Sequence, residues 1–186
     1  MIKIAILGPE STGKSTLTKE LADYFQSPGV AEYAREYIEK LAKPYTYNDV
    51  CHIAHKQISE ENYYNKPENS KSGYVFFDTD LIINKVWLEY KFKQVPDFLN
   101  NQLKKGFFDL YLLCAPDLPW EFDPVREHGD DRDFFFDWYK REIEQTQKPF
   151  VIVDGFGNQR IQNAVNAIRK YSRFSTIKCS PDFTTL

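Results

Sequence analysis

A glycine-rich segment near the N-terminus restricts the possible folds of this chain more than any other feature. Residues 8–15 read Gly-Pro-Glu-Ser-Thr-Gly-Lys-Ser, which fits the G-x-x-x-x-G-K-S/T pattern of a phosphate-binding loop, or P-loop. The apolar run Ile2–Leu7 precedes the segment, and apolar residues at helical spacing, from Leu17 to Phe25, follow it. A strand, this loop and a helix in that order predict a site for a nucleoside triphosphate. A turn that binds nothing is the alternative, and the complete motif with both flanks argues against it.

The residue types in the loop match the chemistry of a bound triphosphate. Two glycines let successive backbone N–H groups point at phosphate oxygens, and the helix N-terminus adds further unpaired donors. Lys14 is expected to reach the β- and γ-phosphates of ATP, and the Ser15 hydroxyl to hold Mg²⁺. The predicted nucleotide-binding residues are Gly8, Glu10, Ser11, Thr12, Gly13, Lys14, Ser15 and Thr16.

The rest of the chain alternates short apolar runs with helical patterns. The further strands are predicted at residues 30–31, 74–77, 110–114 and 150–153, and the further helices at about 33–41, 48–64, 83–90, 96–105, 133–147 and 158–170. This alternation predicts an α/β fold of three layers, a five-stranded parallel sheet with helices on both faces. At 186 residues the chain is expected to form one P-loop kinase domain, residues 1–186, with residues 172–186 left unassigned.

Composition excludes several classes of protein. A net charge of -3, without a Lys/Arg-dense tract, argues against nucleic acid as a partner. No apolar stretch reaches the roughly 18 residues that a membrane span needs. The three cysteines are widely spaced, and the N-terminus enters a strand directly, without a signal peptide. We therefore expect a cytoplasmic protein that acts on a small molecule, and the sequence leaves its oligomeric state open.

Three carboxylates are candidates for the chemistry because ligands bind beyond the carboxyl ends of parallel strands. Asp78 and Asp80 follow an apolar strand, as the acid that holds Mg²⁺ in a P-loop site does. The alternative is that one of them caps the next helix. Glu32 follows the short second strand, where a carboxylate faces the phosphate acceptor and can take a proton from its hydroxyl. A surface carboxylate in the first turn of a helix is the alternative for Glu32.

The segment from about 116 to 132 is rich in proline and charge, and we expect it to form a lid over the triphosphate. Arg126 and Arg132 are the candidates to neutralise charge on the transferred phosphoryl group. An ordinary solvated loop is the alternative. Cys51, His52 and His55 lack a convincing further ligand for zinc, and the aromatic residues 134–136 and 138 are expected to pack in the core.

Four segments together resemble one family. They are the P-loop, Glu32–Tyr37 with the sequence Glu-Tyr-Ala-Arg-Glu-Tyr, Phe77–Asp80 with Phe-Asp-Thr-Asp, and residues 116–126 with Pro-Asp-x-Pro-Trp-x-x-Asp-x-x-Arg. This combination is similar to the ribosylnicotinamide kinase domain of NadR-type bifunctional NAD-biosynthesis proteins, which are P-loop kinases with AAA_28-like ATPase domains. The similarity extends to about Lys170.

The resemblance implies a nucleoside-kinase-like fold with a lid and phosphorylation of the 5′-hydroxyl of nicotinamide riboside by ATP. It also implies that Asp78 serves Mg²⁺ or the hydroxyl, and that an aromatic residue stacks on the pyridine ring. The candidates for stacking are Tyr33, Trp87 and Trp120. The nucleotidyltransferase signature H-x-G-H and a helix-turn-helix are absent from these 186 residues, so neither NAD synthesis from the mononucleotide nor operator binding is expected of them. Pro124 and Val125 depart from the family pattern and leave the acceptor in question.

Two other functions remain open at this point. The same scaffold accommodates kinases for other nucleoside-like or vitamin acceptors. A regulatory switch driven by nucleotide hydrolysis belongs to a different class. GTPases of that class carry a base-recognition segment N-K-x-D. Residues 84–87 read Asn-Lys-Val-Trp, so the aspartate of that segment is replaced by Trp87.

Overall fold

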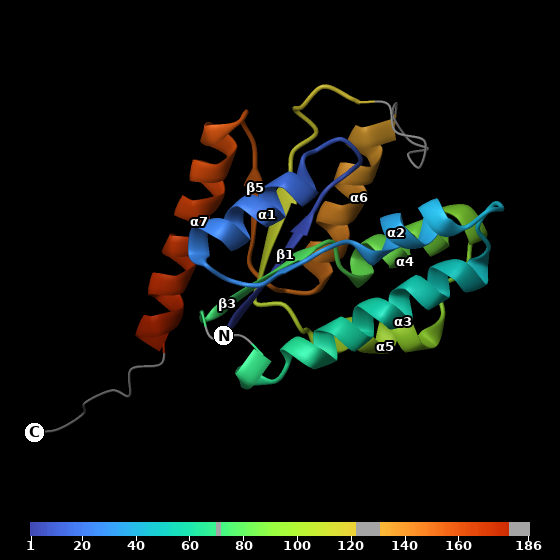
Figure 1. Cartoon of the computed structure of the whole chain (residues 1–186), viewed down its shortest axis with the longest axis horizontal. Coiled ribbons are helices and arrows are strands. Elements are labelled where there is room, and N and C mark those ends of the chain that lie inside the picture. Colours follow the sequence, from blue (N-terminus) through green and yellow to red (C-terminus); the bar gives the residue numbers. More distant parts are fainter. Residues whose placement is uncertain (70–71, 122–130, 179–186) are drawn as a thin grey trace, which may run out of the picture.

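The structure is a computed structural model of the chain and describes residues 1–69, 72–121 and 131–178 (Figure 1). Its strands are β1 (Ile2–Leu7), β2 (Gly29–Val30), β3 (Tyr74–Asp78), β4 (Leu110–Cys114) and β5 (Phe150–Val153). Its α-helices are α1 (Lys14–Phe25), α2 (Tyr33–Lys40), α3 (Tyr47–Tyr64), α4 (Leu81–Phe92), α5 (Asp97–Lys105), α6 (Arg132–Gln145) and α7 (Asn158–Lys178), and a 3-10 turn spans Pro67–Asn69.

The strands form one parallel sheet in the order β2-β3-β1-β4-β5. The central strand β1 is apolar apart from Lys3, and its residues Ile4–Leu7 are buried because helices cover both of its faces. Ile4 and Ile6 pack with α1 and α7 on one face, while Ala5 and Leu7 pack with α4 and α6 on the other. The predicted three-layer fold is therefore confirmed.

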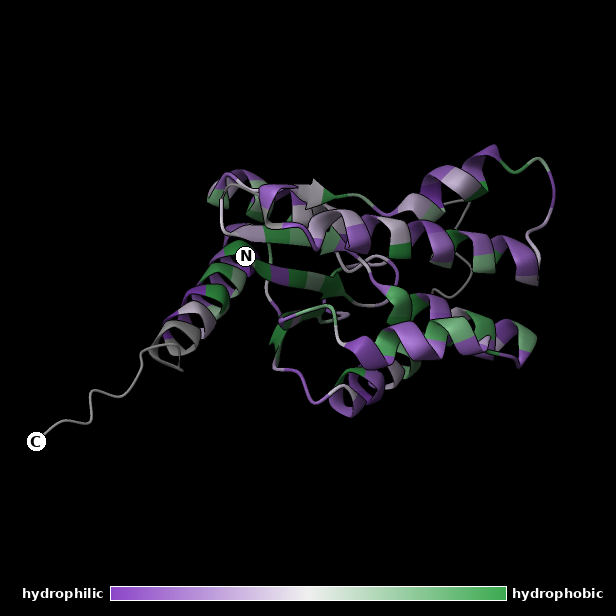
Figure 2. Ribbon diagram, turned by 90° about the horizontal axis from the view of Figure 1, so that it is seen from below, coloured by the Kyte–Doolittle hydropathy of each residue, from purple (hydrophilic) through white to green (hydrophobic). Residues whose placement is uncertain are grey.

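The helices are amphipathic, and their apolar sides face the sheet or one another. Figure 2 shows hydrophobic residues in the central strands and mixed hydropathy on the helices around them. A separate apolar cluster joins α3, α4 and α5, with Val50, Leu81 and Leu99 at its centre. In the part of the chain that the structure describes, no helix combines the length and hydropathy that crossing a membrane requires.

The final helix α7 is longer than the predicted 158–170, since it continues to Lys178. No proline or glycine interrupts residues 158–178, and the first breaker is Pro181. Tyr171 packs against the core, and the Ser172 hydroxyl lies 2.9 Å from the hydroxyl of Tyr74. These two contacts hold the added turns against the sheet. The strand β2 also differs by one residue from its expected position at 30–31.

Candidate active site

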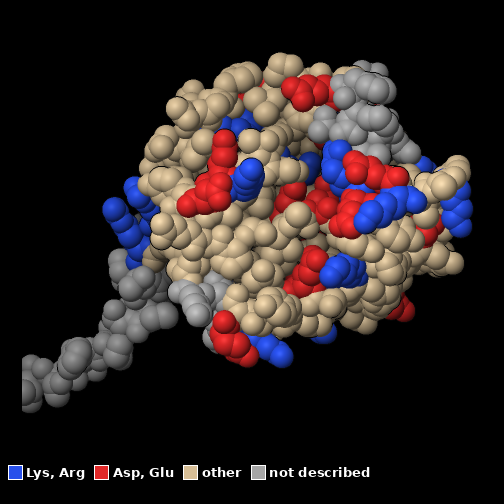
Figure 3. Space-filling view, in the orientation of Figure 1, with Lys and Arg blue, Asp and Glu red and all other residues tan. Residues whose placement is uncertain are grey.

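The strand register brings the predicted site residues to one edge of the sheet. Ile6 pairs with Asp78, and Val30 pairs with Phe77, so β1, β2 and β3 end side by side. A cavity of about 430 Å³ opens at this edge, between the P-loop, the start of α2, α4 and α6. Figure 3 shows acidic and basic side chains next to each other in a hollow of this face. The cavity is large enough for a small-molecule substrate.

Both motif glycines are required by the shape of the P-loop. Gly8 has φ 151°, and a Cβ there would lie 2.8 Å from the Cys114 carbonyl oxygen of β4. Gly13 caps α1 with φ 73°, in the left-handed region that favours glycine. The Thr12 hydroxyl donates a hydrogen bond of 2.8 Å to the Pro9 carbonyl and closes the turn. The sequence thus folds locally into the loop that the motif predicts.

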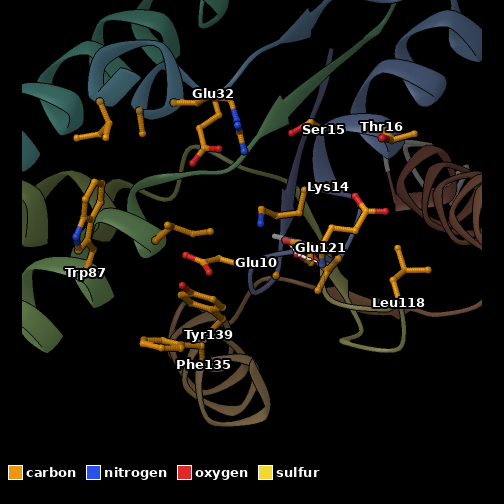
Figure 4. Close-up of a pocket in the computed structure, with 18 of the residues that line it drawn as sticks. Glu10, Lys14, Ser15, Thr16, Glu32, Trp87, Leu118, Glu121, Phe135 and Tyr139 are labelled. Atoms are coloured by element: carbon orange, nitrogen blue, oxygen red, sulfur yellow. Dashed lines mark hydrogen bonds between the residues drawn. The ribbon is translucent and has the colours of Figure 1, made fainter. Parts of the chain in front are cut away.

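Lys14 begins α1, and its side chain points into the cavity (Figure 4). Its Nζ donates a hydrogen bond of 2.8 Å to the Pro9 carbonyl. The ammonium group therefore lies over the inside of the loop, where backbone N–H groups and a cation together attract phosphate oxygens.

Asp78 lies at the end of β3, is 4% exposed, and contacts the Ser15 hydroxyl at the start of α1. Burial raises the pKa of its carboxyl group, while the positive charge of Lys14 and the hydrogen bond from Ser15 oppose that rise. Its Oδ1 is buried and has no hydrogen-bond partner among the described residues. A hydroxyl beside a buried carboxylate with an unpaired oxygen fits the ligand chemistry of Mg²⁺, which prefers oxygen and keeps several waters.

Asp80 makes the capping contact that was the alternative to a metal role. It is the N-cap residue of α4, and its Oδ1 accepts a hydrogen bond of 2.8 Å from the Ile82 backbone N–H. The side chain is 1% exposed, and burial raises the pKa of its carboxyl group to about 8. Asp80 therefore stabilises the helix that follows the site.

Glu32 is the N-cap residue of α2, yet its side chain makes no capping hydrogen bond. It lines the cavity instead and faces the same space as Lys14 (Figure 4). Burial raises the pKa of its carboxyl group, and the charge of Lys14 opposes that rise. A carboxylate with a raised pKa beside a phosphate site is suited to accept a proton near neutral pH.

Aromatic side chains form the wall opposite the P-loop. Trp87 of α4 lines the cavity, and its indole N–H donates to the Tyr45 hydroxyl at 3.0 Å. Phe135 and Tyr139 of α6 also line it, and Figure 4 shows Glu10 of the P-loop lying close to them. Phe135 packs in the core as expected and also borders the cavity, whereas Tyr139 was not among the predicted site residues. Their spacing of four residues, which puts both on one helical face, was the available signal.

The other two candidates for stacking lie elsewhere. Trp120 is 40% exposed, and Tyr33 borders a small pocket beside the main cavity. His52 packs on Tyr37 with ring centroids 5.0 Å apart. Among the residues that the structure describes, no cluster of three or more His, Cys, Asp or Glu side chains forms a metal site.

The predicted lid at 116–132 is described only in part. Arg126, Pro124 and Val125 lie outside the described residues. Arg132 begins α6, and its Nη1 donates a hydrogen bond of 2.8 Å to the Leu118 carbonyl. On the other side of the same segment, the Glu121 backbone N–H donates to the Ser11 hydroxyl at 3.2 Å. Residues 118–121 are therefore attached both to the P-loop and to α6.

Arg160 of α7 is a residue that sequence reasoning missed. It is 5% exposed, and its Nη2 donates to the carbonyl oxygens of Thr12 and Ala115 at 3.0 and 2.9 Å. Its Nη1 forms an ion pair of 2.7 Å with Asp117. Burial raises the pKa of the Asp117 carboxyl group, but hydrogen bonds from Arg160 and the Gly155 N–H outweigh it and lower that pKa. Arg160 also donates to the nearby Gly155 carbonyl at 2.8 Å, but its contacts with Thr12, Ala115 and Asp117 join residues more than 40 positions apart, so no short-range pattern marks them.

Comparisons with known proteins agree with this geometry. The chain matches the AAA_28 family, described as an AAA domain, over residues 3–160. It is 30% identical over 162 residues to the trifunctional NAD biosynthesis/regulator protein NadR of Escherichia coli K12, which covers 81% of this chain and 38% of that protein. The NadR of Salmonella typhimurium LT2 is also 30% identical, over 161 residues, with 81% and 37% covered. The chain therefore spans less than half the length of the curated relatives it matches.

Solved structures show the same likeness. A crystal structure described as NadR protein in complex with NR aligns with a TM-score of 0.73 and 25% identity, over all of this chain and 54% of that one. Thymidylate kinase from Ehrlichia chaffeensis aligns with a TM-score of 0.60 and 13% identity, over 91% and 97% of the two chains, and shares the fold. The predicted resemblance and the P-loop kinase fold are thus confirmed.

Proposed function

This chain belongs to the AAA_28 family, and we propose on that basis that it is a kinase for nicotinamide riboside. It transfers the γ-phosphoryl group of ATP to the 5′-hydroxyl of the riboside, and the products are nicotinamide mononucleotide and ADP. Two solved relatives support this proposal. One NadR structure is described in complex with NR, which is nicotinamide riboside, and another in complex with NAD and AMP-PNP.

The observation that carries the proposal is one continuous cavity with two chemically different ends. The P-loop and Lys14 form a cationic end, and the aromatic side chains of Trp87, Phe135 and Tyr139 form the other. The carboxylates of Glu10 and Glu32 line the space between them. Nicotinamide riboside carries a cationic ring, which aromatic faces and carboxylates attract, and a hydroxyl that must approach the phosphate.

The phosphoryl transfer needs a proton acceptor, and Glu32 supplies it in this proposal. The hydroxyl oxygen attacks the γ-phosphorus, the bond from that phosphorus to the bridging oxygen breaks, and the proton passes to the Glu32 carboxylate. Lys14 and the P-loop N–H groups bind the triphosphate and neutralise its charge. Arg132 and Arg126 belong to the lid that excludes water.

Mg²⁺ is the metal that the site chemistry fits. Ser15 and Asp78 would hold it, and when bound it would neutralise charge on the β- and γ-phosphates. Cys51 and Cys114 are free thiols, as expected in a reducing compartment, and we place the reaction in the cytoplasm with a small-molecule substrate.

The test is ATP consumption with Mg²⁺ across a panel of acceptors. The panel contains nicotinamide riboside, nicotinic acid riboside, thiamine, common nucleosides and deoxynucleosides, and a control without acceptor. Stoichiometric conversion of nicotinamide riboside to its mononucleotide is the expected result. Turnover of a different member alone would reassign the acceptor, and slow hydrolysis that no acceptor stimulates would favour a regulatory switch.

A further inference from the structure

A small side pocket opens next to the main cavity, behind Trp87. It measures about 10 Å³, roughly the free volume that one water-sized group needs. Glu32, Ala34, Ile83 and Trp87 border both spaces, so the side pocket adjoins the aromatic end of the cavity. Its remaining walls come from α2, α3 and the start of α4.

The wall contributed by α3 contains a polar residue where an apolar one is expected. The buried face of α3 includes Val50, Ile53 and Ala54, and the same face continues with Gln57. Gln57 is 5% exposed, and its Nε2 has no hydrogen-bond partner among the described residues. A buried donor without a partner costs about 1–3 kcal/mol. An apolar side chain of the same size would avoid that cost, so the amide is explained best by a ligand that supplies the missing acceptor.

Two other polar residues border the same pocket. Asn84 of α4 and Thr79, which joins β3 to α4, are each 6% exposed. Thr79 has φ 74°, a left-handed conformation that is strained for a β-branched residue. Strained backbone of this kind collects at ligand sites, because the surrounding structure must hold it there.

We propose that Gln57 donates a hydrogen bond from Nε2 to an uncharged carbonyl oxygen on the aromatic ring of the acceptor. The ring stacks against Trp87, and its carbonyl substituent enters the side pocket, which Asn84 also borders. This inference rests on the proposed function and narrows it, because it selects a carboxamide over an unsubstituted ring. A carboxylate substituent is disfavoured, since it would add a negative charge to a cavity that Glu10 and Glu32 already line.

The test compares three ribosides that differ only at the ring substituent. Nicotinamide riboside and 3-acetylpyridine riboside both carry a carbonyl oxygen, and pyridine riboside carries none. Wild type is compared with Gln57→Met, which keeps the length of the side chain and removes its donor. The matched control is Gln102→Met, because the Gln102 Nε2 donates to Glu61 at 3.0 Å and Gln102 borders neither space.

We expect wild type to prefer both carbonyl acceptors over pyridine riboside by about tenfold or more in kcat/KM. In Gln57→Met the kcat/KM values of the three acceptors should differ by less than about threefold, and the KM for ATP should be unchanged. Gln102→Met should keep the wild-type preference for the carbonyl acceptors. Because the variant loses an unpaired buried donor, its melting temperature should equal or exceed that of wild type. If Gln57→Met does not fold, Gln57→Leu takes its place.

The outcomes distinguish a failure of this inference from a failure of the proposed function. An undiminished carbonyl preference in Gln57→Met would overturn the inference and leave the proposed function intact. If wild type phosphorylates only another acceptor, the proposed function falls, and the role of Gln57 is measured on that acceptor instead. An unchanged kcat/KM there would overturn the inference, and a selective loss with unchanged KM for ATP would support it. If no acceptor stimulates turnover, both are wrong.

Discussion

The ammonium group of Lys14 and the carboxylate of Glu32 face the same cavity from opposite sides (Figure 4). Lys14→Ala removes the cation that binds the β- and γ-phosphates, and we expect kcat to fall by about 10²- to 10³-fold. The fold should remain intact, because within the described part of the chain Nζ donates a hydrogen bond only to the Pro9 carbonyl. Turnover and thermal melting check this. Lys19→Ala, on an exposed face of the same helix, is the control and should leave both unchanged.

Substitution of Asp78 and substitution of Glu32 should change different kinetic quantities. Asp78→Asn should weaken the proposed Mg²⁺ site, so a higher Mg²⁺ concentration should be needed for half-maximal turnover, and turnover should fall more than the affinity for nucleotide. Glu32→Gln removes the proposed proton acceptor, and we expect a loss of about 10²- to 10⁴-fold in kcat without a change in the Mg²⁺ requirement. Titrations of turnover against Mg²⁺ measure both.

The pH profile gives a second measure of Glu32. Because burial raises the pKa of its carboxyl group, activity that depends on the unprotonated form should fall on acidification at a pH above the ordinary pKa of 4.5. Should Glu32→Gln retain full activity, the proton acceptor would have to be Asp78.

At the scale of elements, α3 carries a buried carboxyl group that makes stability depend on pH. Glu61 is 2% exposed, and burial raises its pKa from the ordinary value of 4.5 to about 7. Between these values the folded state binds the proton more tightly than the unfolded chain does. The free energy of unfolding therefore falls as the pH rises through this window.

Glu61→Gln removes this titration and keeps an acceptor oxygen for Gln102. We expect the variant to be more stable than wild type by about 1–3 kcal/mol at pH 8, and by much less at pH 5. Urea unfolding at the two pH values measures the difference. Glu68→Gln, at an exposed position, should follow wild type at both. Parallel pH dependence in wild type and Glu61→Gln would show that Glu61 ionises normally in the folded state.

Elements that are determined by a short, continuous stretch of residues could be predicted from the sequence. The P-loop follows from its motif, and β1, β3, β4 and β5 follow from runs that are mainly apolar. Asp80 was harder, because Asp-Thr-Asp before a helix fits both a metal ligand and an N-cap. The contact with Ile82 shows the N-cap, and the metal role stays a prediction. Gln57 and Arg160 could not be assigned, since their roles depend on the packing of elements that are distant in the chain. Tyr139 was marked only by its spacing of four from Phe135.

At the scale of the whole molecule, Arg160 joins three parts of the structure. Its guanidinium group links α7 to the P-loop at Thr12 and to the segment after β4 at Ala115 and Asp117. Arg160→Met leaves the Asp117 carboxylate and three carbonyl oxygens without this donor. We expect the free energy of unfolding to fall by about 3 kcal/mol and the affinity for ATP to decrease. Denaturant unfolding and nucleotide binding measure the two effects.

The control for this prediction is Arg169→Met on the same helix. Arg169 donates to the Tyr24 hydroxyl at 2.6 Å on the surface and should contribute little to either quantity. Equal effects of the two substitutions would show that Arg160 has no special connection to the nucleotide site.

The contact between Arg160 and Thr12 spans 148 positions of the chain. During synthesis the P-loop leaves the ribosome early, but the arginine that braces its carbonyl emerges only after almost all of the sheet has been made. A nascent chain that has not yet reached residue 160 therefore carries the full phosphate-binding motif without this support. We therefore expect a bound nucleotide to stabilise the finished domain more than the growing one, since a ligand stabilises the state that binds it.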